Sequence, residues 1–152
     1  MTQDSIERET TIDATVERVW AVITEPEHVG RWFGDAGAEI DLRPGGEMVM
    51  RWAEYGTARA RVEVVEPPRR FAYRWFHNSH TDDGGEHTPA NSTLVEFTLR
   101  PDGDATRLRV VESGFAGLGV SDEVRAKDFE GNTKGWAHEL GELAEYVARV
   151  AA

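Results

Sequence analysis

The chain has 152 residues, the usual size of one compact domain, and we expect residues 1-152 to form a single domain. Its 17 basic and 28 acidic side chains give a net charge of −11, which repels the phosphate backbone of nucleic acids. Cysteine is absent, which excludes disulfides and thiolate metal sites. We find no apolar signal segment and no apolar run of about 20 residues, so we expect a cytoplasmic protein without a membrane partner.

The N-terminal segment predicts a strand followed by two short helices. The strand spans Ser5 to Ile12, and Asp13 or Thr15 is the candidate cap of the helix that follows. Pro26 ends this helix or opens the next one, which is predicted from Glu27 to Trp32. The apolar residues of the first helix, at helical spacing, are Val16, Val19, Trp20 and Ile23.

From Ala38 the hydrophobic pattern changes to a period of two, which is typical of strands. A first strand is expected over Ala38 to Leu42, and glycine or proline turns separate the later segments. The alternating residues, segment by segment, are Met48, Met50 and Trp52; Ala58, Ala60, Val62 and Val64; Phe71, Tyr73, Trp75 and His77; Val95, Phe97 and Leu99; and Leu108, Val110 and Glu112. Short strands joined by turns predict an antiparallel sheet with one apolar face.

The C-terminal segment carries the strongest periodic signal in the chain. One amphipathic helix is predicted from about Ser121 to Val150. Its apolar positions, spaced four, three, four and three residues apart, are Trp136, Leu140, Leu143, Val147 and Val150. A sheet that buries one face against such a helix belongs to the α+β class of two-layer domains.

Five segments, taken in chain order, resemble the motifs of one protein family. They are IDATVERVWAVITEPEHVGRWF (12–33), PGGEM (44–48), VVEPPRRFAYRW (64–75), TRLRVVESGF (106–115) and NTKGWAHELGELAEYV (132–147). In the first of them, Thr15 stands where the family has proline. Together the segments span nearly the whole chain, and the chain resembles the SRPBCC (START-like) superfamily. The most similar subgroup is that of the homologues of the activator of the heat-shock-protein-90 ATPase.

The resemblance implies a helix-grip fold of the START/Bet v 1-like type. In that fold a curved antiparallel sheet of about six or seven strands wraps around a long C-terminal helix, and two short helices follow the first strand. An internal ligand cavity lies between the sheet and the helix. The superfamily includes lipid carriers, cyclases, hormone receptors and co-chaperones, so the resemblance does not specify the chemistry.

Strand parity and helix phase nominate the residues that face such a cavity. Methionines, aromatic rings and a few polar groups together are typical of an adaptable small-molecule pocket. An ordinary packed core is the alternative interpretation for most of these residues. The candidates are Trp32, Met48, Met50, Trp52, Phe71, Tyr73, Trp75, Val95, Phe97, Val110, Glu112, Phe115, Trp136 and Leu140.

Glu112 is the most specific candidate, because strand parity points its carboxylate inward, where an unpaired charge is costly. One interpretation makes it a polar anchor or general base, with Tyr73 or His77 as hydrogen-bond partner. The other interpretation places it at the end of the sheet in contact with solvent, or pairs it with Arg74 or Arg109. Glu112 is therefore the candidate catalytic residue if the protein is an enzyme.

Two predicted loops contain residues that could have a function. The segment from His77 to Ser92 holds three histidines and three acids, which are metal-ligand types, but its Gly, Asp, Asn and Ser content favours a solvated hairpin loop. We expect no metal site. The apolar, glycine-rich segment 113–119 is either a gate over the cavity or a simple connection.

Three functions are compatible with these observations. The first is the binding of a small hydrophobic or aromatic molecule. The second is a cyclase-like or hydrolase-like enzyme that uses Glu112 with Tyr73 or His77, and the third is a co-chaperone-like protein-interaction module. No nucleotide or phosphate motif is present, so no cofactor is expected, and a homodimer is left open.

Overall fold

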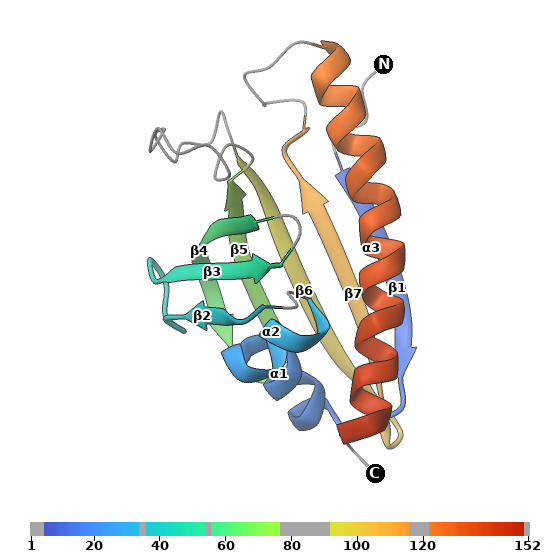
Figure 1. Ribbon diagram of the computed structural model, residues 1–152. Helices are drawn as coiled ribbons and strands as arrows, with labels where there is room; N and C mark the ends of the chain where they lie inside the picture. The colour runs from blue at the N-terminus through green and yellow to red at the C-terminus, as the bar shows by residue number, and fades with distance from the viewer. Residues whose placement is uncertain (1–4, 34–35, 54–55, 77–91, 116–121, 151–152) are drawn as a thin grey trace.

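A computed structural model describes residues 5–33, 36–53, 56–76, 92–115 and 122–150 (Figure 1). The order of elements is the one expected from the sequence, a strand, two short helices, six strands and a long helix. The elements are β1 (Ser5–Ile12), α1 (Val16–Thr24), α2 (Pro26–Trp32), β2 (Ala38–Ile40), β3 (Glu47–Trp52), β4 (Gly56–Glu66), β5 (Arg70–Phe76), β6 (Ser92–Asp102), β7 (Ala105–Ser113) and α3 (Asp122–Val150).

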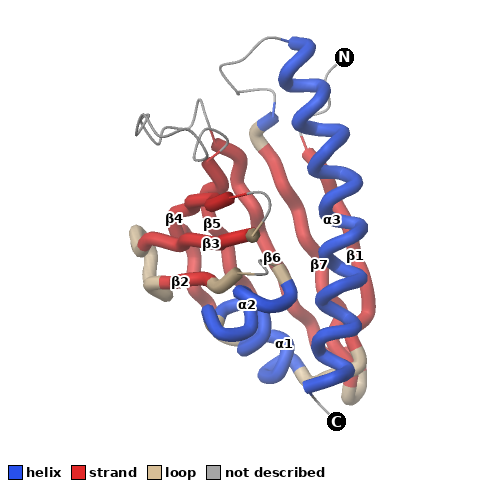
Figure 2. Tube along the Cα trace, in the orientation of Figure 1, coloured by secondary structure: helices blue, strands red, loops and turns tan. Residues whose placement is uncertain are grey.

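The seven strands form one antiparallel sheet in the order β1-β7-β6-β5-β4-β3-β2. The first strand pairs with the last, with Ser5 opposite Ser113 and Ile12 opposite Thr106, so β1 forms one edge of the sheet beside the strand that precedes α3. Figure 2 shows the sheet curving around one side of α3. The short helices α1 and α2 cover the same face of the sheet, beside the lower half of α3 in this view. The α+β helix-grip prediction is confirmed.

Specific residues define the ends of the two short helices, and one hydrogen bond joins the helices to each other. The side chain of Thr15 accepts a hydrogen bond from the backbone N–H of Arg18 at 3.3 Å, so Thr15 is the cap of α1. Pro26 occupies the first turn of α2, where a missing N–H is harmless. The indole of Trp32 donates to the carbonyl of Val22 at 2.8 Å, which fixes the end of α2 against α1.

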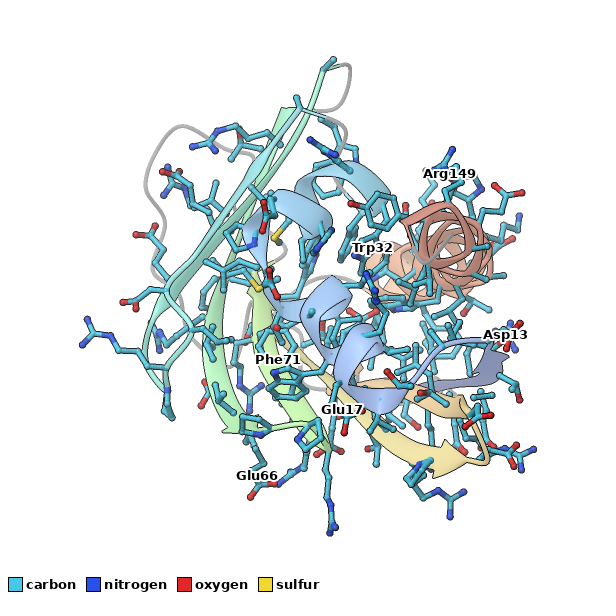
Figure 3. All side chains as sticks on the ribbon, turned by 90° about the horizontal axis from the view of Figure 1, so that it is seen from below. Asp13, Glu17, Trp32, Glu66, Phe71 and Arg149 are labelled. Atoms are coloured by element: carbon cyan, nitrogen blue, oxygen red, sulfur yellow. The ribbon has the colours of Figure 1, made fainter. Side chains whose placement is uncertain are left out.

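The long helix α3 buries one stripe on the sheet, as its periodicity predicts. Trp136, Leu140, Leu143 and Val147 are all buried in the core. Tyr146, which was not part of the predicted stripe, is also buried, and its hydroxyl lies 2.6 Å from Nδ1 of His28 on α2. Figure 3, which looks nearly along α3, shows side chains filling the space between this helix, the short helices and the sheet.

The predicted strand pattern is wrong at one point of β4. Val62 lies opposite Tyr73, but the pairing resumes with Val64 opposite Ala72, so the strand has a bulge at this point. A bulge changes the face to which the following residues point. Val64 therefore does not continue the buried row of Ala58, Ala60 and Val62, and Val65 packs against the core instead.

No helix in these described ranges has the combination of length and apolar composition that crossing a membrane requires. The 29 residues of α3 are long enough, but charged side chains recur along the helix. The surface of the described residues is also poor in large apolar groups, and Leu42 is the one such side chain that is exposed.

Leu143→Ala tests the packing of α3 on the sheet. Leu143 is 0% exposed, so its truncation is expected to lower the free energy of unfolding by about 2–5 kcal/mol. Leu42→Ala is the matched control, because Leu42 is 39% exposed and its loss should change the free energy by less than about 0.5 kcal/mol. Equal effects of the two substitutions in urea denaturation would contradict the packing.

Candidate functional site

A pocket of about 140 Å³ opens between α3 and the concave face of the sheet. Four separate parts of the chain form its wall, namely the residue after α2, β5, β7 and the middle of α3. The lining residues are Phe33, Trp75, Glu112, Asn132, Gly135, Trp136 and Glu139. Three of them are aromatic and two are acidic, and the described lining contains no basic side chain.

The aromatic rings of the pocket hold one another in place. Phe33 stacks on Trp75 with ring centroids 5.6 Å apart and an interplanar angle of 4°. The centroid of Phe33 is also 5.8 Å from that of Trp136 on the opposite helix. Trp52 on β3 helps to hold Phe33 in position, because its indole donates a hydrogen bond to the backbone carbonyl of Phe33 at 2.9 Å. The segment after α2 is thereby attached to both layers of the fold.

The carboxylate of Glu112 is buried, with 1% of the residue exposed, and it accepts hydrogen bonds from both layers. Thr93 on β6 donates to Oε2 at 2.5 Å, and the indole of Trp136 donates to Oε1 at 2.9 Å. The amide of Asn132 lies 3.0 Å from Oε1 and 3.1 Å from Oε2. An ionised carboxylate has about four acceptor positions, so these donors engage both of its oxygens.

Through these hydrogen bonds with Thr93, Asn132 and Trp136, Glu112 joins β7 to β6 and α3. Parity correctly predicted that its side chain points inward, but the proposed partners differ. The hydroxyl of Tyr73 has no hydrogen-bond partner among the described residues, and His77 lies outside them. The arginines considered as alternatives lie elsewhere, with Arg74 4.0 Å from Glu63 and Arg109 2.9 Å from Glu7. The prediction that Tyr73 bonds to Glu112 is wrong.

Glu139 is the second carboxyl group of the pocket, and its position is different. Its Oε2 atom is buried and has no hydrogen-bond partner in the described part of the chain. Burial, assisted by the charge of Glu142 on the same helix, raises the pKa of Glu139 to about 7. A carboxyl group with this pKa exchanges its proton near neutral pH, and its free oxygen can accept a hydrogen bond from a ligand.

Tyr73 adds a second unsatisfied polar group near the pocket. The residue is 1% exposed, and its ring packs against Phe71 and Phe97 with centroid distances of 5.6 and 6.2 Å. Burial and the neighbouring charges of Glu112 and Glu139 raise its pKa well above the ordinary value, so the hydroxyl keeps its proton. A buried hydroxyl without a partner is uncommon in proteins and requires an explanation.

The structure divides the predicted cavity residues into three groups. Trp75, Glu112 and Trp136 line the pocket. Trp52 is half-buried and packs against the core. The remaining candidates lie in the buried core cluster: Trp32, Met48, Met50, Phe71, Tyr73, Val95, Phe97, Val110, Phe115 and Leu140. The sequence pattern thus identified the inward faces, while the pocket occupies only a small part of them.

Five residues that line the pocket or donate to Glu112 were not among the predicted site residues. The sequence pattern could have identified three of them. Thr93 precedes Val95 by two residues and so lies on the same strand face. Asn132 and Glu139 lie four residues before and three residues after Trp136, which places them on the same side of the helix. Phe33 follows the end of α2, and Gly135 has no side chain, so neither had a periodic signal. The sites missed were thus mostly polar residues on predicted apolar stripes.

The metal-site hypothesis cannot be followed into the histidine-rich loop, because residues 77–91 lie outside the described chain. Among the described residues, Glu25, Glu27 and His28 place possible ligand atoms within 4.8 Å of one another. Nδ1 of His28 is already engaged with the hydroxyl of Tyr146, and both acids belong to the surface around Pro26. This group therefore carries no argument for a metal.

The curved sheet, the closing helix and the pocket between them define a helix-grip protein. The sequence profile of the family described as Activator of Hsp90 ATPase homolog 1-like protein matches residues 13–148. The chain belongs to this family. The comparison with curated proteins gave no match.

Solved structures agree with this assignment. The protein MLL2253 from Mesorhizobium loti is 23% identical, with a TM-score of 0.75 over 95% of this chain and 97% of that chain. The Aha1 dimer from Colwellia psychrerythraea is 16% identical, with a TM-score of 0.72 over 95% of this chain and 96% of that chain. DynU16, a protein in the dynemicin biosynthetic locus, is 25% identical, with a TM-score of 0.73 over 96% of this chain and 48% of that chain. The two less similar proteins show the fold alone.

Glu112→Gln tests whether the carboxylate holds the two layers together. The substitution keeps the shape but replaces one acceptor by an amide that is itself a donor, so at least one buried donor among Thr93, Asn132 and Trp136 loses a good partner. We expect the free energy of unfolding to fall by about 1–3 kcal/mol at neutral pH. Glu145→Gln, on the exposed side of α3, removes the same charge and should have little effect. Unchanged or increased stability of Glu112→Gln would refute the role.

The raised pKa of Glu139 predicts a pH dependence of stability. Because the folded protein holds this proton more tightly than the unfolded chain, the stabilisation is full below about pH 4.5 and declines as pH rises to about 7. Glu139→Gln removes the titrating group and should flatten this decline. The difference between pH 5 and pH 8 should shrink by about 1–2 kcal/mol, a value reduced because the carboxyl keeps partial solvent contact.

Unfolding in urea at a series of pH values, for the parent protein and for Glu139→Gln, measures this effect. Glu145→Gln is again the control, since it alters the net charge equally on the same helix. Parallel pH profiles for the parent and Glu139→Gln would show that Glu139 has an ordinary affinity for its proton.

Proposed function

We propose that this protein binds a small aromatic molecule in the pocket between α3 and the sheet. The observation that carries the proposal is a partly open pocket with aromatic walls and an unused buried acceptor on Glu139. Apolar walls with a small number of placed polar groups are the usual composition of a small-molecule site. Offset or edge-on contacts between aromatic rings would add to the area that such a ligand buries.

The size of the pocket supports a ligand, or part of a ligand, with a single ring. An apolar cavity of about 150 Å³ is known to hold one benzene molecule. The pocket of about 140 Å³ is close to that size. A larger ligand would extend through the open side, with one ring between Phe33, Trp75 and Trp136. DynU16, with a similar fold, comes from a biosynthetic locus, which is consistent with a small-molecule role.

The two alternative functions receive less support. Glu112 is a poor general base in this arrangement, because protein donors engage both of its oxygens. A protein-interaction module is expected to present an apolar patch, and Leu42 is the one exposed large hydrophobic side chain among the described residues. The binding interpretation requires neither feature.

Gly135→Leu offers a direct test, because Gly135 lines the pocket and a Cβ at this position meets no atom within 4 Å. The leucine side chain should occupy the ligand's space without displacing the backbone. Gly141→Leu is the matched control, since Gly141 lies on the exposed side of the same helix and its Cβ position is equally open. Both substitutions also remove a helical glycine, so their effects on helix propensity cancel.

Binding of benzyl alcohol, followed by ligand-observed NMR and by tryptophan fluorescence, is the measurement. We expect saturable binding to the parent and to Gly141→Leu, and at least about tenfold weaker binding to Gly135→Leu, the size of effect that blocking a tight apolar site produces. Absence of binding to the parent, or equal binding to all three proteins, would refute the proposal.

A further inference from the structure

The charges around the pocket restrict the chemistry of its ligand. Glu112 and Glu139 both line it, and the described lining contains no lysine, arginine or histidine. When Glu139 is ionised, above its pKa of about 7, its carboxylate adds a negative charge to this wall, and Glu142 on the next turn of α3 is a second acid close enough to act on it. An anionic ligand would be repelled by this arrangement, because charges interact strongly where solvent is largely excluded.

The two carboxyl groups have different capacities for a ligand. The oxygens of Glu112 are engaged by Thr93, Asn132 and Trp136, whereas Oε2 of Glu139 is buried and unpartnered among the described residues. The hydroxyl of Tyr73, which is 1% exposed, is likewise without a partner there and lies near enough to feel both charges. Of the two acids that line the pocket, Glu139 is thus the one with an oxygen left for a group that donates a hydrogen bond.

The rings of the pocket favour a donor that is also positively charged. Phe33, Trp75 and Trp136 line the same space, and the face of an aromatic ring attracts a cation. A neutral hydroxyl could satisfy the free oxygen of Glu139, but it would bring no positive charge to the ionised Glu139 carboxylate, and the described lining contains none. A cation supplies both the hydrogen bond and the opposite charge, and such charge-assisted bonds are stronger than neutral ones.

We propose that the pocket selects an organic cation, an aromatic or arylalkyl amine whose ammonium group binds Glu139 while its ring lies among Phe33, Trp75 and Trp136. This inference rests on the proposed binding function and specifies its ligand class. Glu139 is the group that determines the charge preference, and Glu112 maintains the shape of the site.

Benzylammonium, benzyl alcohol and benzoate form a matched set of probes, because they share a ring and have similar sizes but differ in charge. The isothermal titration is carried out at about pH 8, above the pKa of about 7 of Glu139, and at about 0.15 M salt, which screens the general effect of the net charge of −11. We expect benzylammonium to bind at least about tenfold more tightly than benzyl alcohol, and benzoate to bind most weakly. In Glu139→Gln the two first probes should bind within about threefold of each other, while benzyl alcohol binding shows that the pocket is still folded.

Glu145→Gln is the control for net charge and should keep the preference for benzylammonium. If benzyl alcohol and benzylammonium bind the parent equally, the inference on charge is wrong while the proposed function stands. If the preference survives in Glu139→Gln, or disappears equally in Glu145→Gln, the assignment to Glu139 is wrong. If no probe binds the parent, the proposed function itself fails, and this inference fails with it.

Discussion

The buried carboxylate of Glu112 connects the sheet to the long helix. Burial of an ionised group is costly, and here the cost is offset by donors from β6 and α3 that reach both oxygens. Apolar packing of Leu140, Leu143 and Val147 holds α3 against the sheet but is not directional. The bonds from Asn132 and Trp136, one helical turn apart, set the rotation of the helix, and so determine which of its residues face the pocket.

The same rotation explains why the two acids of the pocket behave differently. With Asn132 and Trp136 directed at Glu112, the next position on that face of the helix is Glu139, which lines the pocket and whose buried Oε2 has no donor among the described residues. One carboxylate of the pocket thus holds the two layers in register, and the other keeps an oxygen without a hydrogen bond. A perturbed carboxyl group beside an aromatic pocket is a common property of ligand sites, and it directs attention to Glu139 rather than Glu112.

Membership of the family defines the scaffold and leaves the chemistry to the site. MLL2253 and the Aha1 dimer share this architecture at 23% and 16% sequence identity, so the fold tolerates extensive change of sequence and does not by itself specify a function. In this chain the lining comes from four distant segments, and only Phe33 lies outside a regular element. The stacking of Phe33 on Trp75 attaches that segment to the sheet and makes it part of a stable wall.

The sequence by itself determined the class of fold, the order of elements and the buried faces. Period-two and helical patterns are local consequences of backbone geometry, so the stripe from Trp136 to Val147 and the inward direction of Glu112 could be derived from spacing alone. Val64 departs from the predicted alternation because β4 has a bulge after Val62, and the local sequence pattern does not reveal this bulge. Only the tertiary structure decided three other features. These are the hydrogen-bond partners of Glu112, the unpartnered oxygen of Glu139 among the described residues, and the fact that three of the predicted inward-facing residues line the pocket. They depend on the rotation of α3 and on the approach of Phe33, which bring together groups up to about a hundred residues apart, and sequence periodicity contains no information on such distances.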